Sequence, residues 1–243
     1  MSKTEATLTR KDMKEPDKFQ QAATQAASWI ASRRRHVVIA GAVAVGVVVA
    51  IAALSALQSR RAERAGAAAS DLLNAMGGEI SAVPLPGFPG PFYESEDARQ
   101  RAIVATADRV LAEHAGNGAG VLAALAKGDA HLRLRDWDAA RVAYERFLAD
   151  ADRDDSLRFG ALEGLGLAAE GKGDLDGAAA AYERLGREAP AFADRADLER
   201  ARVLAQAGKA GPAREILAAF AGRHGSSPLA GEAAARLARL GDK

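Results

Sequence analysis

The same phrase occurs twice in this sequence, at residues 136–147 and again at residues 174–185. Both copies carry Asp, Ala, Tyr, Glu and Arg at matching positions, and every match is separated by 38 residues. The match extends upstream, where Gly128 in the first copy corresponds to Gly166 in the second. Self-similarity with a period of about 20–50 residues is typical of stacked structural repeats. We therefore expect a stack of small units over this part of the chain.

The composition indicates that these units are helical. The chain of 243 residues is 49% hydrophobic but only 5% aromatic, and alanine is its commonest apolar residue. Alanine favours helices, whereas the β-branched residues that favour strands are concentrated in one segment. The predicted fold class is therefore all-α. The chain has no cysteine, which excludes disulfides, thiolate metal ligands and cysteine nucleophiles.

Charge is divided unevenly along the chain. Residues 1–64 have 11 basic and 5 acidic side chains, a balance of +6, whereas residues 65–243 have a balance of −5. A basic arm before an acidic body suits a protein that crosses a membrane. An acidic body is also a poor nucleic-acid binder, so no nucleic-acid partner is expected.

Residues 1–36 form a basic tail. Residues 1–15 are polar without apolar periodicity and are predicted to be disordered. A helix can begin at Pro16, because the first turn does not need the N–H that proline lacks. With Trp29 nearby, its apolar residues predict an amphipathic helix on the membrane surface, and a polar spacer is the alternative. These residues recur at helical spacing at Phe19, Ala23, Ala26 and Ile30.

The long apolar run extends from Val37 to Leu57 without a charged residue. As a helix with a rise of about 1.5 Å per residue it would be about 32 Å long, which matches a hydrocarbon core of about 30 Å. Eight basic residues precede the run, among them Arg33, Arg34 and Arg35, and three follow it closely. The positive-inside rule then places the N-terminus in the cytoplasm. We expect a single-pass anchor at residues 37–57.

Other interpretations of this run are weaker. A cleavable signal peptide usually has a shorter apolar stretch and a leader shorter than these 36 residues. The sequence at 32–35 resembles a twin-arginine signal, although basic flanking explains it equally well. A buried core helix would need a polar face, which the run lacks. Ala42, Gly46 and Ala50 form a small-residue row that would let two helices pair, but in a chain this rich in alanine and glycine chance explains the row.

Residues 62–120 are expected to form capping or degenerate helices around a proline-rich loop. Residues 79–94 hold four of the eight prolines, which excludes a helix and the interior of a sheet. We expect an ordered loop whose aromatic residues pack on the first helices, and a proline-rich recognition segment is the alternative. One helix is predicted at residues 62–76 and a second from a Ser95 cap to His114. Asn117 to Gly120 are expected to end the second helix. The apolar stripes of the two helices are Ala65, Ala68, Leu72 and Ala75, and Ile103, Ala107, Val110 and Leu111.

From residue 121 three units can be aligned by their small and aromatic residues. The pattern resembles the tetratricopeptide repeat, whose two antiparallel helices carry a small residue in the first helix and a small residue followed by an aromatic in the second. The resemblance implies a tetratricopeptide-type α-solenoid over residues 121–243, with the aromatic filling the space to the next repeat. The aligned residues are Gly128, Ala140 and Tyr144; Gly166, Ala178, Tyr182 and Pro190; and Ala201, Ala213 and Leu217.

The third unit departs most from the family pattern. Where the family usually has a large side chain in the first helix, this chain has Ala124, Leu162 and Asp197. A carboxylate cannot pack as that side chain does, so Asp197 makes the third unit the weakest match.

Turn and capping residues complete the repeat assignment. Asp136 and Asp174 stand at N-cap-like positions inside the first two units. Ser227 and Pro228 open a final helix that is expected to cap the stack. Its apolar stripe is Ala230, Ala234, Leu237 and Leu240.

The order of the segments gives a second resemblance. A basic tail, one span and a small acidic repeat domain are similar to the layout of bacterial membrane-anchored tetratricopeptide-like proteins, typified by the ancillary subunit of the Sec translocon. This resemblance implies an inner-membrane protein with a periplasmic domain. It also implies protein partners near the translocon and among envelope chaperones.

No pattern of catalytic or cofactor-binding residues is found. Residues 164–169 match a loosened dinucleotide fingerprint, but no strand is predicted before them. Residues 166–173 resemble a phosphate loop, but Gly173 stands where that loop needs a hydroxyl side chain. Gly171 to Gly173 are more simply a helix C-cap and turn. We expect a non-catalytic chain with no cofactor, metal or small-molecule substrate. Its histidines share no metal-ligand spacing and are His36, His114, His131 and His224.

The predicted function is a membrane-anchored interaction scaffold. A structural subunit of an envelope or membrane assembly, or a cytoplasm-facing adaptor if the topology is inverted, are the alternatives. The family's groove positions were carried over by register. They lack the Lys/Asn cluster with which some family members clamp a C-terminal carboxylate, and solvated surface charges are the other interpretation. These positions are Leu125, Asp129, Leu132, Arg133, Glu163, Leu167, Glu170, Arg195, Leu198 and Arg202.

Overall fold

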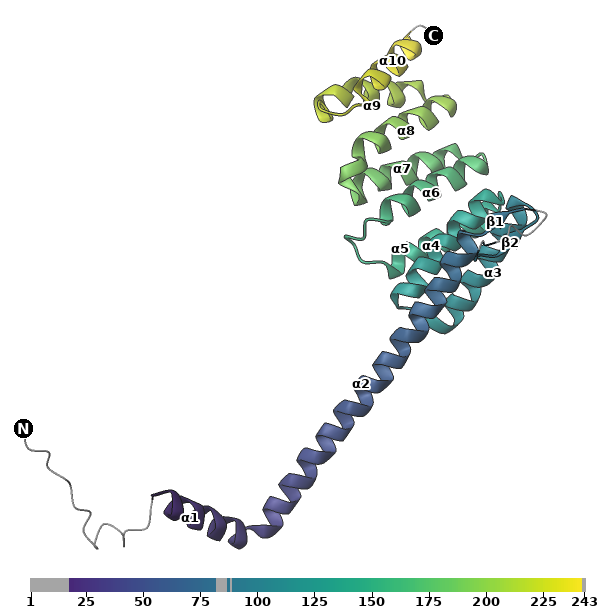
Figure 1. Ribbon diagram of the computed structural model, residues 1–243. Helices are drawn as coiled ribbons and strands as arrows, with labels where there is room; N and C mark the ends of the chain where they lie inside the picture. The colour runs from purple at the N-terminus through teal and green to yellow at the C-terminus, as the bar shows by residue number, and fades with distance from the viewer. Residues whose placement is uncertain (1–17, 82–86, 88, 242–243) are drawn as a thin grey trace, which may run out of the picture. The chain divides into compact units, whose positions relative to one another are not determined.

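The computed structural model describes residues 18–81, 87 and 89–241. It is 81% helical, and its helices pack in neighbouring pairs, so the prediction of an all-α helical stack is confirmed (Figure 1). The helices are α1 (Lys18–Ser32), α2 (Arg34–Met76), α3 (Glu96–His114), α4 (Gly118–Arg133), α5 (Trp137–Asp150), α6 (Arg158–Gly171), α7 (Leu175–Glu188), α8 (Ala193–Gln206), α9 (Ala210–Arg223) and α10 (Ala230–Gly241). The remaining elements are strands β1 (Glu79–Ile80) and β2 (Phe92–Tyr93) and the 3-10 helix η1 (Pro190–Phe192).

The chain divides into two compact units, residues 1–61 and 62–243. The first unit contains α1 and the first part of α2, which is long and apolar enough to cross a membrane, with a mean hydropathy of 2.9. None of that apolar stretch is buried against protein. On α1, Trp29 is exposed, and the Arg33 guanidinium lies 5.2 Å from the centre of its ring. Residues 1–15 and the side chains of Phe19 and Ile30 lie outside the described residues.

Residues 62–76, predicted as a helix that follows the span, are the last turns of α2 itself. Good helix formers at 58–65 and the lack of a proline let the helix continue past the apolar run. Leu72 and Ala75 are buried and Ala65 and Ala68 are half-buried, as the predicted stripe requires. They pack in a core with the buried residues of α3 and α4.

The proline-rich segment contains a short pair of strands that the sequence did not predict. β1 and β2 run parallel, with Glu79 opposite Phe92 and Ile80 opposite Tyr93. The Glu79 N–H donates to the Pro91 carbonyl at 3.0 Å, so proline supplies an acceptor where it could not supply a donor. Tyr93 is half-buried over Gly78, where a methyl group would overlap its ring. Residues 82–86 and 88 lie outside the described residues.

The ends of α3 show one prediction confirmed and one wrong. Ser95 caps the helix, and its hydroxyl accepts the Ala98 N–H at 3.1 Å, as expected. Asn117 was expected to help end this helix, but it caps the next one instead. Its side-chain oxygen accepts the N–H groups of Ala119 and Gly120, because α4 begins at Gly118 directly after the turn.

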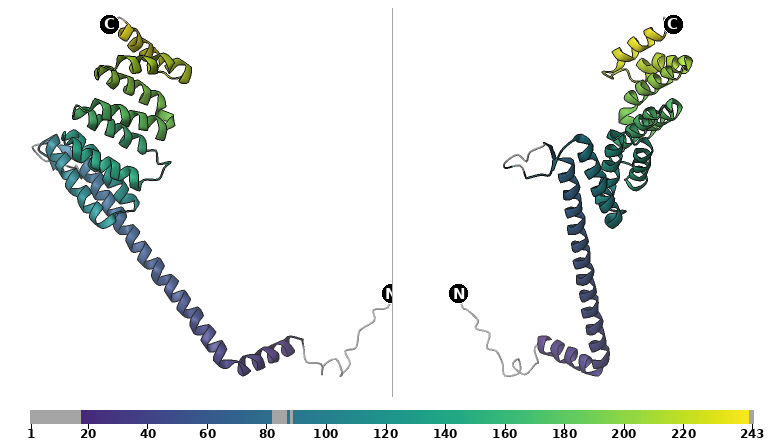
Figure 2. Two further views of the ribbon diagram at one scale, coloured as in Figure 1. Left: turned by 180° about the vertical axis from the view of Figure 1, so that it is seen from behind. Right: turned by 90° about the vertical axis from the view of Figure 1, so that its right-hand side faces the viewer.

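Residues 118–223 form three helical hairpins with a common register: α4 with α5, α6 with α7, and α8 with α9. Figures 1 and 2 show them following one another along the second unit, with α10 at the end. The aligned small residues Ala140, Ala178 and Ala213 are all completely buried. In α10 the buried alanine is Ala233 and not the expected Ala234, which is exposed.

Tyr144 joins the first two hairpins. Its ring covers Gly128 of α4, where a methyl carbon would lie 2.6 Å from Tyr144 Cδ1, and it also covers Gly164 of the next hairpin. Tyr182 covers Gly166 in the same way. The two glycines of the supposed dinucleotide fingerprint, Gly164 and Gly166, therefore lie within α6, where they leave space for the rings of Tyr144 and Tyr182. The expected role of the aromatic, filling the space to the next hairpin, is seen at Tyr144.

The turn inside each hairpin has the same backbone geometry. Arg135, Gly173 and Gly208 occupy equivalent positions, and all have left-handed backbones with φ of 60°, 79° and 76°. In each case the following residue donates its N–H to the carbonyl five residues earlier, over 2.9 Å. This arrangement satisfies carbonyls that the end of a helix leaves free. The expected cap and turn at Gly171 to Gly173 is therefore confirmed.

Only one of the two predicted aspartate caps forms. The Asp174 carboxylate accepts the Gly177 N–H at 2.8 Å and lies where a methyl group on Gly177 would be. Asp136 makes no cap hydrogen bond and lies 3.3 Å from His131 Nδ1. The first hairpin has Ala139 in place of Gly177, and the Asp136 carboxylate lies beside His131 instead of over the first turn of α5.

Replacing Gly164 by alanine is expected to destabilise the protein by about 1–3 kcal/mol, because the new methyl group overlaps a ring that cannot leave its packed site. Gly160→Ala in the same helix meets no atom within 4 Å and should be neutral or stabilising, by up to about 1 kcal/mol. Chemical unfolding of the full chain in detergent micelles measures both. Equal effects of the two variants would contradict the ring-on-glycine packing.

The shared left-handed turn gives a second prediction. Gly173→Ala and Gly208→Ala should each cost about 1 kcal/mol, since an L side chain is strained at these φ values. Arg135→Gly should not destabilise, because glycine relieves the strain that arginine already carries there. The same unfolding measurement tests all three variants, and a loss on Arg135→Gly as large as on Gly173→Ala would contradict the assignment.

Candidate functional site

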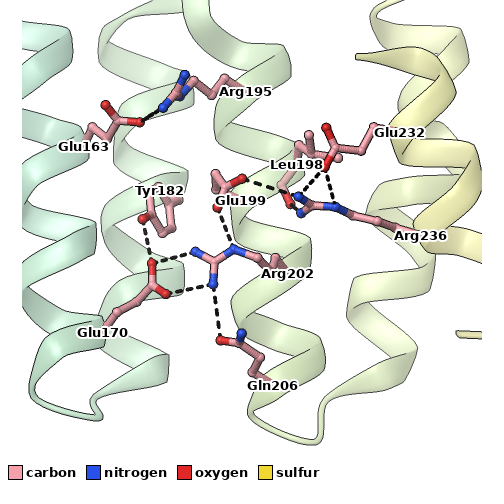
Figure 3. Close-up of polar contacts among 10 residues, drawn as sticks. All are labelled: Glu163, Glu170, Tyr182, Arg195, Leu198, Glu199, Arg202, Gln206, Glu232 and Arg236. Atoms are coloured by element: carbon pink, nitrogen blue, oxygen red, sulfur yellow. Dashed lines mark hydrogen bonds and ion pairs between the residues drawn. The ribbon is translucent and has the colours of Figure 1, made fainter. Parts of the chain in front are cut away.

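The predicted groove residues belong to the first helices of the hairpins, α4, α6 and α8. Side chains of α10 continue the same surface, because Arg236 of α10 lies 3.7 Å from Glu199 of α8. We call this surface the first-helix face. Figure 3 shows its α6, α8 and α10 portion, where polar side chains from neighbouring helices point toward one another.

The α4–α6 portion of the first-helix face carries three leucines among its charged residues. Leu125 and Leu132 of α4 are half-buried and pack against the main core. Leu167 of α6 is 42% exposed, and Arg133 is exposed beside this group on α4. The exposed Leu167 offers apolar contact area to a partner.

Asp129 is held by the ring that joins the hairpins. The Tyr144 hydroxyl donates to Asp129 Oδ1 at 2.7 Å. Partial burial raises the pKa of Asp129, and the hydrogen bond from Tyr144 and the nearby Arg133 only partly oppose that effect. Burial beside this carboxylate also raises the pKa of Tyr144, so the tyrosine stays a donor.

Glu163 and Arg195, predicted as separate groove positions, form an ion pair between α6 and α8. Arg195 Nη2 lies 2.5 Å from Glu163 Oε1 (Figure 3). The Arg195 guanidinium also lies 5.8 Å from the centre of the Phe159 ring, and Phe159 stacks on Phe192 with centroids 3.8 Å apart. The ion pair therefore lies beside an aromatic stack that connects α6 with η1.

Glu170 and Arg202 form the strongest contact of the face. Two guanidinium nitrogens of Arg202 donate to the two Glu170 oxygens at 2.7 and 2.8 Å, and the Tyr182 hydroxyl donates to Glu170 at 2.7 Å (Figure 3). Such a two-pronged pair is shorter and stronger than a neutral hydrogen bond. Burial raises the pKa of Glu170, but the hydrogen bonds from Arg202 and Tyr182 outweigh it and hold the pKa below its usual value.

The same network continues into α10. Arg202 also contacts Glu199 at 2.6 Å, and Arg236 contacts Glu232 at 2.6 Å. Arg236 donates to the Leu198 carbonyl at 3.0 Å as well. Leu198 was expected to face the groove, but its side chain is 3% exposed and belongs to the core. Only its carbonyl takes part in the face, because the helix turns its side chain inward at that position.

Asp197, which makes the third unit the weakest match to the repeat pattern, is paired with basic side chains. Its carboxylate lies 2.8 Å from His224 Nε2 and 3.0 Å from Arg223 Nη1, at the end of α9. A polar residue at a packing position is tolerated because these two side chains cover it. Within the described residues, no group of three or more His, Asp or Glu is arranged to hold a metal ion.

Sequence reasoning named both partners of the Glu163–Arg195 and Glu170–Arg202 pairs, but it did not predict the pairing. It missed Tyr182 as a hydroxyl donor, and it missed Glu199, Glu232 and Arg236 altogether. The spacing of Glu232 and Arg236 on one helix face is the signal that would have found the last two. As a whole, the α6–α8–α10 portion of the face is a series of mutually neutralised charges that ties successive hairpins together.

Comparisons with known proteins do not assign the chain to a family. No family model matches the chain, and no curated protein matches it significantly. The first-helix face is therefore interpreted from its own residues.

Glu170 and Asp129 should differ in how the ionisation of their carboxyl groups changes the free energy of unfolding. The folded-state pKa of Glu170 lies below its usual 4.5, so its stabilisation is complete above about that pH and is lost as the pH falls through the folded value. Glu170→Gln should therefore cost about 2 kcal/mol at neutral pH and much less at low pH.

Asp129→Asn is the matched control. The pKa of Asp129 is raised, so the stabilisation by its protonated form is complete below the usual 3.8 and is lost as the pH rises through the folded value. The asparagine keeps an acceptor for Tyr144 and should be as stable as the wild type, or more so, at neutral pH. Urea unfolding across pH measures both variants, and a pH-independent loss on Glu170→Gln would contradict the charged pairing.

Proposed function

We propose that this chain is a membrane-anchored, non-catalytic scaffold for protein–protein interaction. Its helical hairpins would form a tetratricopeptide-type repeat domain that faces the periplasm from a bacterial inner membrane. It would serve protein translocation or envelope chaperone traffic by holding protein partners. The observation that carries the proposal is the joining, in one chain, of an uncovered apolar helix with three hairpins of common register.

Two features of the hairpins support the repeat assignment. The small residues of the aligned units occupy equivalent buried positions, at Ala140, Ala178 and Ala213. The turns share one left-handed geometry. A stack of equivalent helix pairs presents an extended surface, which is how such proteins bind segments of their partners.

A structural subunit of an envelope assembly is the second candidate. The observation that favours it is that Glu163 pairs with Arg195 and Glu170 with Arg202, so these charges are used inside the domain. In that case the contact with other subunits would involve a different surface.

A photo-crosslinking residue introduced in living cells tests the scaffold against the subunit. Placed at Leu167 or Arg133 on the first-helix face, it should capture a protein partner, because these positions are exposed without being part of the ion pairs. Val142 on α5, 59% exposed, is the matched control on a second helix of a hairpin. Capture only from Val142 would favour the structural subunit.

Topology is tested separately with reporter fusions at the two ends of the chain. The basic residues before the apolar run predict a cytoplasmic N-terminus and a reporter outside the cytoplasm at the C-terminus. A cytoplasmic C-terminus would overturn the periplasmic proposal and indicate the cytoplasm-facing adaptor.

A further inference from the structure

An open groove in the second unit lies between α8, α9 and α10. It has a volume of about 1210 Å³. Small-molecule sites usually enclose about 300–1,000 Å³ and cover most of their ligand. An open groove of this size is better suited to a segment of polypeptide than to a small molecule.

The floor of the groove is apolar and its rim is rich in arginine. Small and aliphatic side chains of the three helices form the floor, and they include Ala205 and Leu217. Four arginines line the groove together with a single carboxylate, Glu232. The arginines are Arg202, Arg214, Arg236 and Arg239.

Only two of these four arginines pair with described carboxylates. Arg202 is held by Glu170 and Glu199, and Arg236 is held by Glu232. Arg214 donates to the Leu240 carbonyl at 2.5 Å, and Arg239 donates to the Ala235 carbonyl of its own helix at 3.2 Å.

Among the residues that the structure describes, neither Arg214 nor Arg239 forms an ion pair with a carboxylate. A carbonyl satisfies a donor but does not neutralise the charge, so no carboxylate of the described residues compensates these two guanidinium charges. They stand out because residues 65–243 have a net charge of −5.

We propose that the groove between α8, α9 and α10 binds an acidic, partly apolar peptide segment of a partner protein. Its carboxylates would lie on Arg214 and Arg239, and an apolar side chain would cover Ala205 and Leu240. The inference rests on the proposed function as an interaction scaffold and names the chemistry of the partner. Charge complementarity is the reason for an acidic segment, because the acidic surface elsewhere repels it and the groove attracts it.

The test uses the full chain in neutral detergent micelles and fluorescence anisotropy. The probe is a fluorescein-labelled peptide of alternating glutamate and leucine, and the matched peptide has glutamine in place of glutamate. The first peptide should bind, and the second should bind about tenfold or more weakly. Equal binding of the two peptides would overturn the proposal.

Variants locate the site. Arg239→Gln should weaken binding about tenfold, and Arg214→Gln/Arg239→Gln about a hundredfold, since a charge-assisted bond contributes about 1.4 kcal/mol or more. Arg239 is the cleaner position, because its only described hydrogen bond is within its own helix. Arg101→Gln/Arg141→Gln removes the same charge from exposed positions elsewhere and should leave binding unchanged.

Three outcomes would overturn the inference. The control pair could weaken binding as much as the groove pair, or inorganic phosphate could displace the peptide at low concentration, which would indicate a simple anion site. Binding could also appear only after Asp242→Asn, which would make the chain's own terminus the occupant. A failure here, with crosslinks from Leu167 intact, would remove the groove assignment and leave the scaffold function standing.

Discussion

The packing of Tyr144 against two glycines is the contact on which the arrangement of the hairpins depends. Its ring occupies space that side chains on Gly128 and Gly164 would fill, one in its own hairpin and one in the next. Because the ring is completely covered, its hydroxyl needs a partner, and Asp129 supplies it at 2.7 Å. One side chain thus sets the approach of two hairpins and also fixes a carboxylate on the first-helix face.

The next boundary between hairpins is built differently. Tyr182 covers Gly166 in its own hairpin, but the residue of the third hairpin that corresponds to Gly164 is Glu199. A ring cannot sit against that side chain as it sits against glycine. Contact between α6 and α8 is made instead by Glu163 with Arg195 and by the Glu170 pair with Arg202. The polar residues that sequence comparison placed in a ligand groove therefore have a structural task at this boundary.

Periodicity and residue size were sufficient to predict the helix pairs, their register and the buried Ala140, Ala178 and Ala213, although not the buried alanine of α10. They could not predict which charges would meet, because that depends on the rotation between hairpins, and this rotation is not encoded in the spacing along one helix. Leu198 shows the limit, since a register carried over from another family placed an inward-facing side chain on the surface. The Asp136 cap failed for a more local reason, because its carboxylate lies 3.3 Å from His131 Nδ1 at the end of α4.

The two kinds of boundary give the helical unit an uneven response to its medium. Salt weakens ion pairs in proportion to their exposure, whereas the packing of a ring on glycine is insensitive to it. Glu163–Arg195 and Glu170–Arg202 are partly exposed, so a rise in ionic strength would weaken their contribution at the second boundary. The second and third hairpins would stay joined, because Leu185, Ala196 and Leu198 are buried in the core that they share.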